Sequence, residues 1–329
     1  MKINFRGIIH KKYFGESALV FNTIIWGGTF VIVKNSLNDI SSMLFVGIRF
    51  LIASLILLPF AYKELKKLDR KSAAMGILVG VFLFLGFSTQ TVGLNFTTAT
   101  KSGFITGSLV MFTPLLQLII EKRKPTFGAM FGSFLVLMGL VFLSVRDTSI
   151  WNLFYELGSN FNFGDVMTLL CAVFFAMQIV FLDRASRRMN FKALTFLQLS
   201  ITSMLALTLA AALSVSGIEP MRAEFTGSLL GGLAYTAFLA TFVTMTVQTR
   251  FQKEVSPTKA GIIYSFEPLF AAVFAFFALG EGFTLFSFIG CALIFSGLLA
   301  SELLEKPGVR AKAEEPAGEP EVGIEKDGF

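Results

Sequence analysis

The sequence predicts an all-α integral membrane protein with ten transmembrane helices, arranged as two inverted five-helix repeats. The first observation is the composition: 54% of the 329 residues are hydrophobic and only 15% are charged, against about 25% charged residues in soluble domains. The second is a series of apolar runs of about 20 residues, the length of a membrane-spanning helix. The third is an internal repeat within that series.

Charged residues separate the apolar runs and set the limits of the expected helices. Because each run is continuously apolar and does not alternate as a barrel strand would, helices are the expected spanning form. The ten expected helices cover residues 17–36, 41–62, 72–94, 98–120, 126–145, 164–183, 192–215, 227–249, 257–279 and 283–302.

Lys and Arg residues predict the orientation of these helices, since loops on the cytoplasmic side retain positive charge. The two termini and alternate loops carry 22 of the 28 basic residues, and the remaining loops carry only Lys34, Arg146 and Arg222. A helix count wrong by one would spread the basic loops over both faces. We therefore expect a multi-pass protein of the cytoplasmic (inner) membrane with both termini in the cytoplasm.

A shift of 158 residues aligns two parts of the chain without a gap. The matching positions are Gln90 and Gln248, Thr100–Gly103 and Thr258–Gly261, Gly132 and Gly290, and Gly139 and Gly297. The shift relates the third to fifth expected helices to the eighth to tenth, so each unit has five helices. An odd number inverts the second copy in the membrane, and inverted repeats are a common basis for alternating-access transporters.

The repeat divides the chain into five expected parts. The last part is polar, acidic and contains Pro and Gly, which is typical of disorder. The parts are a cytoplasmic N-terminus (1–16), a first five-helix repeat (17–145), an extracytoplasmic loop (146–163), a second five-helix repeat (164–302) and a disordered cytoplasmic tail (303–329).

Short motifs follow one another in a fixed order along the spans. They are Trp26–Phe30, Arg49–Phe50, Thr97–Gly107, Pro114, Ser256–Ala260, Glu267–Phe270 and Gly280–Glu281. In their order and spacing, residues 17–302 resemble the EamA-type ten-helix exporters of the drug/metabolite transporter (DMT) superfamily. The resemblance implies a central cavity lined by the first, third, fourth, sixth, eighth and ninth helices. It also implies export of amino acids, other metabolites or drugs.

Polar or amphipathic residues at mid-depth are the candidate solute-binding residues. Two groups recur at helical spacing and so share one helix face each. An alternative role for each member is hydrogen bonding between helices, which is common in membranes. The candidates are Asn22, Trp26, Thr29, Gln90, Thr106, Gln178, Thr241, Thr244, Gln248 and Tyr264.

Four charged residues lie within or at the ends of the spans. Glu267 precedes Pro268 in the ninth span, where a charge costs about 2.5–3.5 kcal/mol on insertion scales. It is a proton-coupling or cation-binding carboxylate in the cavity, or it has a structural role, in which it pairs with Arg49 or accepts hydrogen bonds near the proline break. Lys101 and Lys259 begin the fourth and ninth helices, where cations oppose the helix dipole and need a compensating partner.

Pro114 and Pro268 are candidate hinges. Proline removes a backbone hydrogen bond and loosens the preceding turn of a helix. The alternative is a static kink held by packing.

These features predict a secondary transporter that exports a small organic metabolite by alternating access. His10 is the only histidine and lies before the first span, so we expect no enzyme activity, metal or cofactor. A lipid flippase, a non-transporting membrane subunit and, less favoured, a membrane-embedded enzyme stay open. The expected partners are a small-molecule solute, the lipid bilayer and a proton or counter-solute, without nucleic acid. We expect a monomer or homodimer.

Overall fold

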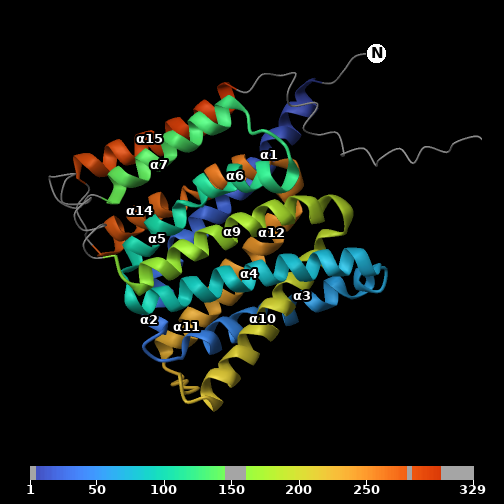
Figure 1. Cartoon of the computed structure of the whole chain (residues 1–329), viewed down its shortest axis with the longest axis vertical. Coiled ribbons are helices and arrows are strands. Elements are labelled where there is room, and N and C mark those ends of the chain that lie inside the picture. The colour runs from blue at the N-terminus through green and yellow to red at the C-terminus, as the bar shows by residue number, and fades with distance from the viewer. Residues whose placement is uncertain (1–4, 145–160, 280–283, 305–329) are drawn as a thin grey trace, which may run out of the picture.

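The computed structural model describes residues 5–144, 161–279 and 284–304, and these residues are almost entirely helical (Figure 1). Within these ranges the strand-like pairing is one isolated bridge, between Ile40 and Ala223. The elements of the first half are α1 (Phe5–Gly27), α2 (Thr29–Ser36), α3 (Ser42–Leu65), α4 (Arg70–Phe96), α5 (Ala99–Gly107), α6 (Leu109–Glu121) and α7 (Phe127–Ser144).

The second half repeats this pattern with shorter segments near its end. Its elements are α9 (Phe163–Arg188), α10 (Phe191–Val215), α11 (Gly227–Ala234), the π-helix η1 (Tyr235–Val243), α12 (Thr244–Phe251), the 3₁₀ turn η2 (Gln252–Glu254), α13 (Pro257–Tyr264), α14 (Glu267–Leu279) and α15 (Leu285–Leu303). Most of the predicted loop 146–163 and of the predicted tail 303–329 lies outside the described residues.

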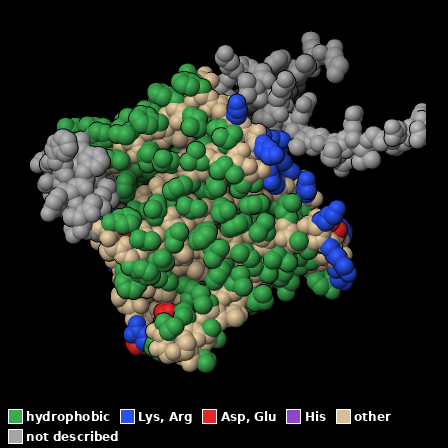
Figure 2. All heavy atoms as spheres, viewed as in Figure 1, with side chains coloured by type: hydrophobic (Ala, Val, Ile, Leu, Met, Phe, Trp, Pro, Cys, Tyr) green, Lys and Arg blue, Asp and Glu red, His purple; other side chains and the backbone are tan. Residues whose placement is uncertain are grey.

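Eight helical stretches in the described part of the chain are long and apolar enough to cross a membrane. The apolar stretch 127–143 of α7 is shorter, and the expected ninth span is divided between α13 and α14. The predicted all-helical membrane fold is thus confirmed for the described residues, while the count of ten stays a prediction. In Figure 2, hydrophobic side chains cover most of the visible face, and Lys and Arg gather mainly along one edge.

Three expected spans are broken where the sequence predicts continuous helices. The breaks lie at Gly28, at Ser108 and at residues 265–266. At Ser108 and Ser265 the ψ angles are −7° and 0°, far from the value of about −42° of an α-helix. The Ser108 hydroxyl donates to the carbonyl of Ile105 at 2.6 Å and so competes with the helical ladder. Hydrophobic periodicity carries no signal for such a break.

The first helix also differs from its predicted limits. α1 begins at Phe5, twelve residues before the expected start of the first span at residue 17, and continues to Gly27. Basic residues in its early turns do not prevent helix formation, since Lys and Arg are good helix formers. The apolar stretch that qualifies as a span begins at Phe14.

Glycines bring α7 and α15 into close contact along one edge of the molecule (Figure 1). A Cβ at Gly139 would lie 2.7 Å from the carbonyl oxygen of Gly290, and a Cβ at Gly297 would lie 2.7 Å from that of Gly132. Residue numbers rise along one helix as they fall along the other, so α7 and α15 are antiparallel. Small residues permit this backbone approach between membrane helices.

Gly139→Leu is expected to destabilise the fold, because the added side chain has no space between α7 and α15. Overpacking of this kind costs about 1–3 kcal/mol, and we expect a lower midpoint of thermal unfolding in detergent. Gly231→Leu is the matched control, since a Cβ at Gly231 meets nothing within 4 Å. Equal midpoints for the two variants would contradict the close contact.

Candidate functional site

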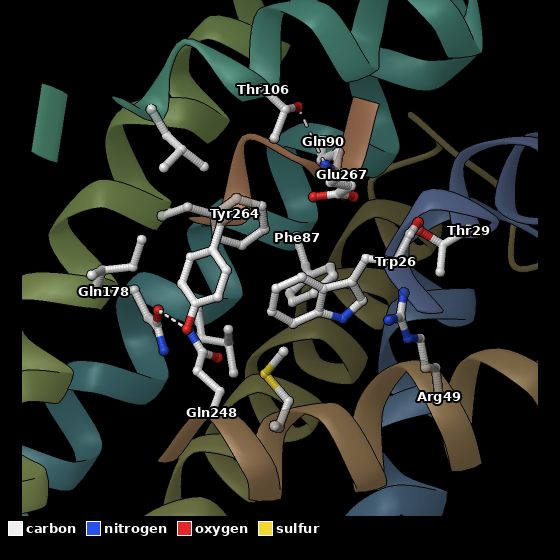
Figure 3. A pocket seen from close by; sticks show the side chains of 15 residues that line it. Trp26, Thr29, Arg49, Phe87, Gln90, Thr106, Gln178, Gln248, Tyr264 and Glu267 are labelled. Carbon is white, nitrogen blue, oxygen red and sulfur yellow. Dashed lines mark hydrogen bonds between the residues drawn. The ribbon is translucent and has the colours of Figure 1, made fainter. Parts of the chain in front are cut away.

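A cavity with an empty volume of about 520 Å³ lies in the middle of the helical bundle (Figure 3). The cavity is lined by Trp26, Thr29, Arg49, Leu83, Phe87, Gln90, Thr106, Leu109, Phe175, Gln178, Ile179, Met245, Gln248, Tyr264 and Glu267. The six expected helices implied by the family resemblance all contribute, and α3 adds Arg49.

Aromatic rings form the apolar part of the cavity wall. Trp26 and Tyr264 meet edge to face, with ring centroids 5.4 Å apart. Phe87 and Phe175 meet in the same way at 5.0 Å. Edge-to-face pairs of this kind stabilise a fixed ring orientation, so the wall has a defined shape.

Arg49 is a buried cation at the cavity edge, only 4% exposed. Its Nε donates to Thr241 Oγ1 at 2.6 Å, and its Nη2 donates to the carbonyl of Ala240 at 3.0 Å. The guanidinium also lies 4.8 Å from the ring centroid of Phe87. A guanidinium has five N–H donors, so donors remain for an anionic group in the cavity.

The π-helix η1 supplies the partners that hold Arg49 and Trp26. The carbonyl of Ala240 accepts from Trp26 Nε1 at 3.2 Å as well as from Arg49. Thr244 Oγ1, at the start of α12 directly after η1, lies 3.0 Å from the same indole nitrogen. π-Helical turns are frequent at functional sites, and here one such turn orients two cavity residues.

Glu267 lies at the first position of α14 and lines the same cavity as Arg49. A helix N-terminus favours a carboxylate, and the break at residues 265–266 creates that N-terminus inside the bundle. Among the described residues, none forms a hydrogen bond or an ion pair with this carboxylate. Arg49 and Glu267 form no direct ion pair, although the two charges are close enough to interact electrostatically. Arg49 hydrogen-bonds to Thr241 and Ala240.

Amide side chains form the polar part of the wall. Gln90 Nε2 donates to Thr106 Oγ1 at 3.3 Å, and Gln248 Nε2 donates to Gln178 Oε1 at 3.4 Å. Gln178 in turn donates to Gln198 at 3.0 Å. These amides have several donors and acceptors each, so a solute can exchange one partner for another.

The structure brings seven of the ten predicted solute-binding residues into the cavity lining. Trp26, Thr29, Gln90, Thr106, Gln178, Gln248 and Tyr264 line it. Three others lie one layer behind it. Thr241 holds Arg49, Thr244 contacts Trp26, and Asn22 donates through Nδ2 to the carbonyl of Thr244 at 2.9 Å.

The remaining predicted residues lie away from the lining. Lys101 and Lys259 form ion pairs with Asp165 and Glu16, respectively. Pro114 lies inside α6, six residues after the break at Ser108, and Pro268 lies in the first turn of α14, just after the break at residues 265–266.

The lining also contains apolar residues that the sequence prediction did not include. Leu83, Phe87, Leu109, Phe175, Ile179 and Met245 are in this group. Their hydrophobicity does not distinguish them from lipid-facing neighbours. Two of them occupy equivalent positions of the repeat, because Phe87 and Met245, like Gln90 and Gln248, are 158 residues apart.

Comparison with known proteins gives one family. The profile of the EamA-like transporter family matches the chain twice, over residues 13–145 and 162–302. An uncharacterized transporter of Archaeoglobus fulgidus is 33% identical over 293 residues, which cover 89% of this chain and 87% of that protein.

More distant relatives share the same extent of chain. YoaV, an uncharacterized transporter of Bacillus subtilis, is 22% identical and covers 84% of this chain and 92% of its own length. The S-adenosylmethionine/S-adenosylhomocysteine transporter of Chlamydia muridarum is 23% identical over 84% of this chain and 90% of its own length. A crystal structure described only as that of a protein matches with a TM-score of 0.68 at 15% identity, covering 88% of this chain and 97% of that chain.

Proposed function

Since this chain belongs to the EamA-like transporter family, we propose that it exports a small organic metabolite by alternating access. The membrane is the cytoplasmic (inner) membrane, and both termini are cytoplasmic. The gathering of Lys and Arg along one edge in Figure 2 supports this orientation.

The ten spans form two inverted five-helix repeats in this proposal. The antiparallel contact of α7 with α15 supports the inversion, because the repeat shift exchanges Gly132 with Gly290 and Gly139 with Gly297. A second contact supports it as well: Ser265 Oγ donates to the carbonyl of Gly107 at 3.1 Å, and these positions are 158 residues apart. A contact between equivalent positions is expected close to a two-fold axis.

The solute is an amino acid or a related compound that carries both a cationic and an anionic group. One observation carries this proposal: Glu267 lines a cavity together with Arg49, and the two do not neutralise each other in an ion pair. A solute ammonium would compensate Glu267, and a solute carboxylate would bind the free donors of Arg49. The aromatic wall would contact an apolar side chain. Both compounds named for the Chlamydia relative contain an amino-acid group.

Glu267 also couples transport to a proton or a counter-solute in this proposal. A carboxylate that faces the cavity and forms no hydrogen bond or ion pair with the described residues is able to bind either a proton or the solute cation, which makes the two compete. The helix breaks at Ser108 and at residues 265–266, with Pro114 and Pro268 beside them, supply the hinges. Broken helices next to the site are common in secondary transporters.

Counterflow in reconstituted vesicles tests the solute class. We expect vesicles loaded with an unlabelled amino acid to accumulate its labelled form, because a carrier exchanges solute across the membrane. The N-acetyl derivative and the methyl ester of the same amino acid should exchange at least about tenfold less, since each lacks one of the two charges. Protein-free vesicles are the control. Equal exchange of all three compounds, or none, would contradict the proposed site.

A further inference from the structure

Lys101 forms an ion pair with the buried carboxylate of Asp165 at one end of α5. Lys101 Nζ lies 2.6 Å from Asp165 Oδ2, and the Asp165 side chain is fully buried. Thr97 Oγ1 donates to the other carboxylate oxygen at 2.7 Å, and the backbone N–H of Asn162 donates to Oδ2 at 3.0 Å. The carboxylate is therefore fixed at the start of α9 while it holds the lysine of α5.

Lys259 forms a second buried ion pair at the start of α13. Its Nζ lies 2.6 Å from Glu16 Oε1 and also contacts Glu302. The Lys259 side chain is only 7% exposed, and those of Glu16 and Glu302 are 17% and 21% exposed. This pair joins α13 to α1 and α15.

The two lysines occupy equivalent positions in the two halves of the chain, since Lys101 and Lys259 are 158 residues apart, in the register of the internal repeat. Their acids, Glu16 and Asp165, are 149 residues apart and so lie outside this register. Each acid nevertheless follows the same two residues, as Phe14–Glu16 and Phe163–Asp165 read Phe-Gly-Glu and Phe-Gly-Asp. Each lysine comes from one half and its acid from the other, so each pair joins the two halves.

The two lysines lie at opposite ends of the cavity. The helix pair α5–α6 runs antiparallel to the pair α13–α14. Three contacts establish this: Thr258 Oγ1 donates to Gln117 Oε1 at 2.6 Å, a Cβ at Gly261 would lie 3.0 Å from Thr113 Oγ1, and Ser265 Oγ donates to Gly107 O at 3.1 Å.

Each lysine is also close to the cavity lining. Lys101 precedes Thr106 by five residues, and Lys259 precedes Tyr264 by five. Five residues correspond to about 7.5 Å along a helix. The ion pairs are therefore positioned between the cavity and the two ends of the bundle.

We propose that the Lys101–Asp165 and Lys259–Glu16 ion pairs are reciprocal latches that close the two ends of the cavity. Opening toward one face breaks the latch on that face while the other stays formed. The charges of a latch attract each other strongly only while water is excluded. When the cavity opens, water hydrates the separated charges. Breaking the ion pair by opening therefore costs less free energy than separating the same charges in a dry interior. This inference rests on the proposed carrier function, and both latches are closed in this structure.

Accessibility of a cavity cysteine tests the latches. The reporter is Thr29→Cys in a chain with Cys171→Ser and Cys291→Ser, and its rate of reaction with a membrane-impermeant thiol reagent is measured from each face of vesicles. Neutral variants remove the lysine of a latch together with the acids that it contacts, so that no acid is left without its lysine. These variants are Lys101→Met/Asp165→Asn for one latch and Lys259→Met/Glu16→Gln/Glu302→Gln for the other.

Each neutral variant is expected to raise the labelling rate by about tenfold from the face on which its latch lies, because more molecules are then open toward that face. The labelling rate from the opposite face should fall. Lys101→Arg, which keeps a cation opposite Asp165, should leave the rates close to those of the parent. Equal increases from both faces would overturn the latch proposal, because they indicate general loosening. Unchanged rates would overturn it as well.

The outcome separates the latches from the carrier function. Labelling that does not respond to the neutral variants, in a parent that still performs counterflow, rejects the latches and keeps the carrier. If the neutral variants change labelling from one face but the parent exchanges no solute, the carrier function is rejected. The ion pairs would then still control access to the cavity from the two faces.

Discussion

Glu267→Gln is expected to abolish gradient-driven transport. The variant keeps the shape of the side chain but removes its charge, which faces the cavity and accepts no hydrogen bond from the described residues. Loss of a hydrogen bond to a charged group, worth about 1.5–3 kcal/mol, corresponds to a fall of about ten- to hundredfold in transport efficiency. The measurement is initial transport rate against solute concentration in vesicles, with and without a proton gradient.

The way in which activity is lost identifies the role of Glu267. A pure coupling carboxylate would leave counterflow intact in Glu267→Gln while accumulation driven by a proton gradient disappears. A solute-binding carboxylate would weaken both. Glu267→Asp is the control, because it keeps the charge and shortens the side chain by one methylene. Unchanged gradient-driven transport in Glu267→Gln would make the residue structural.

Arg49→Met is expected to cause the second-largest loss. The substitution leaves Thr241 Oγ1 and the Ala240 carbonyl without their buried donor, and it removes the cation beside Phe87. We expect transport of an amino acid to fall to the level of its methyl ester, since the carboxylate then has no cationic partner. Arg49→Lys should restore little, because an ammonium lacks the planar fork of a guanidinium.

A matched control separates this effect from the general loss of an arginine. Arg250→Met removes an exposed ion pair with Glu254, in which Nη1 and Oε1 are 3.5 Å apart. Arg250 is far less buried than Arg49, and exposed ion pairs contribute little to stability. We expect a change of less than about twofold in that variant. Retained discrimination between amino acid and ester in Arg49→Met would exclude Arg49 from carboxylate binding.

Sequence reasoning located eight helical stretches that are long and apolar enough to span a membrane, because the bilayer sets both helix length and charge placement. The predicted helix at residues 41–62 corresponds to α3 (Ser42–Leu65), and that at 192–215 to α10 (Phe191–Val215). Glu267 and Arg49 were identifiable for the same reason, since a charge inside an apolar run needs an explanation. The breaks at Ser108 and residues 265–266 were not, because they depend on local hydrogen bonds and not on hydrophobicity.

Residues behind the cavity wall could not be distinguished from residues in it. Thr241 and Thr244 share a helix face with Gln248, and all three are buried, but only Gln248 lines the cavity. Helical spacing shows that residues point in the same direction from the helix axis, but it does not show how far each lies from the centre of the cavity. The acidic partners of Lys101 and Lys259 were not predicted, because acidic residues are common at the ends of membrane spans. The Phe-Gly-acid sequence that both partners share could have identified them.

The direction of insertion of the two halves is the measurement that tests the inverted repeat most directly. Phe127 and Leu285 begin α7 and α15, are 158 residues apart and are 75% and 74% exposed. In a chain with Cys171→Ser and Cys291→Ser, single cysteines at these positions would be treated with an impermeant thiol reagent. We expect Leu285→Cys to react from the outer face and Phe127→Cys only after the membrane is permeabilised. Reaction of both from the same face would contradict the inverted arrangement and the carrier built on it.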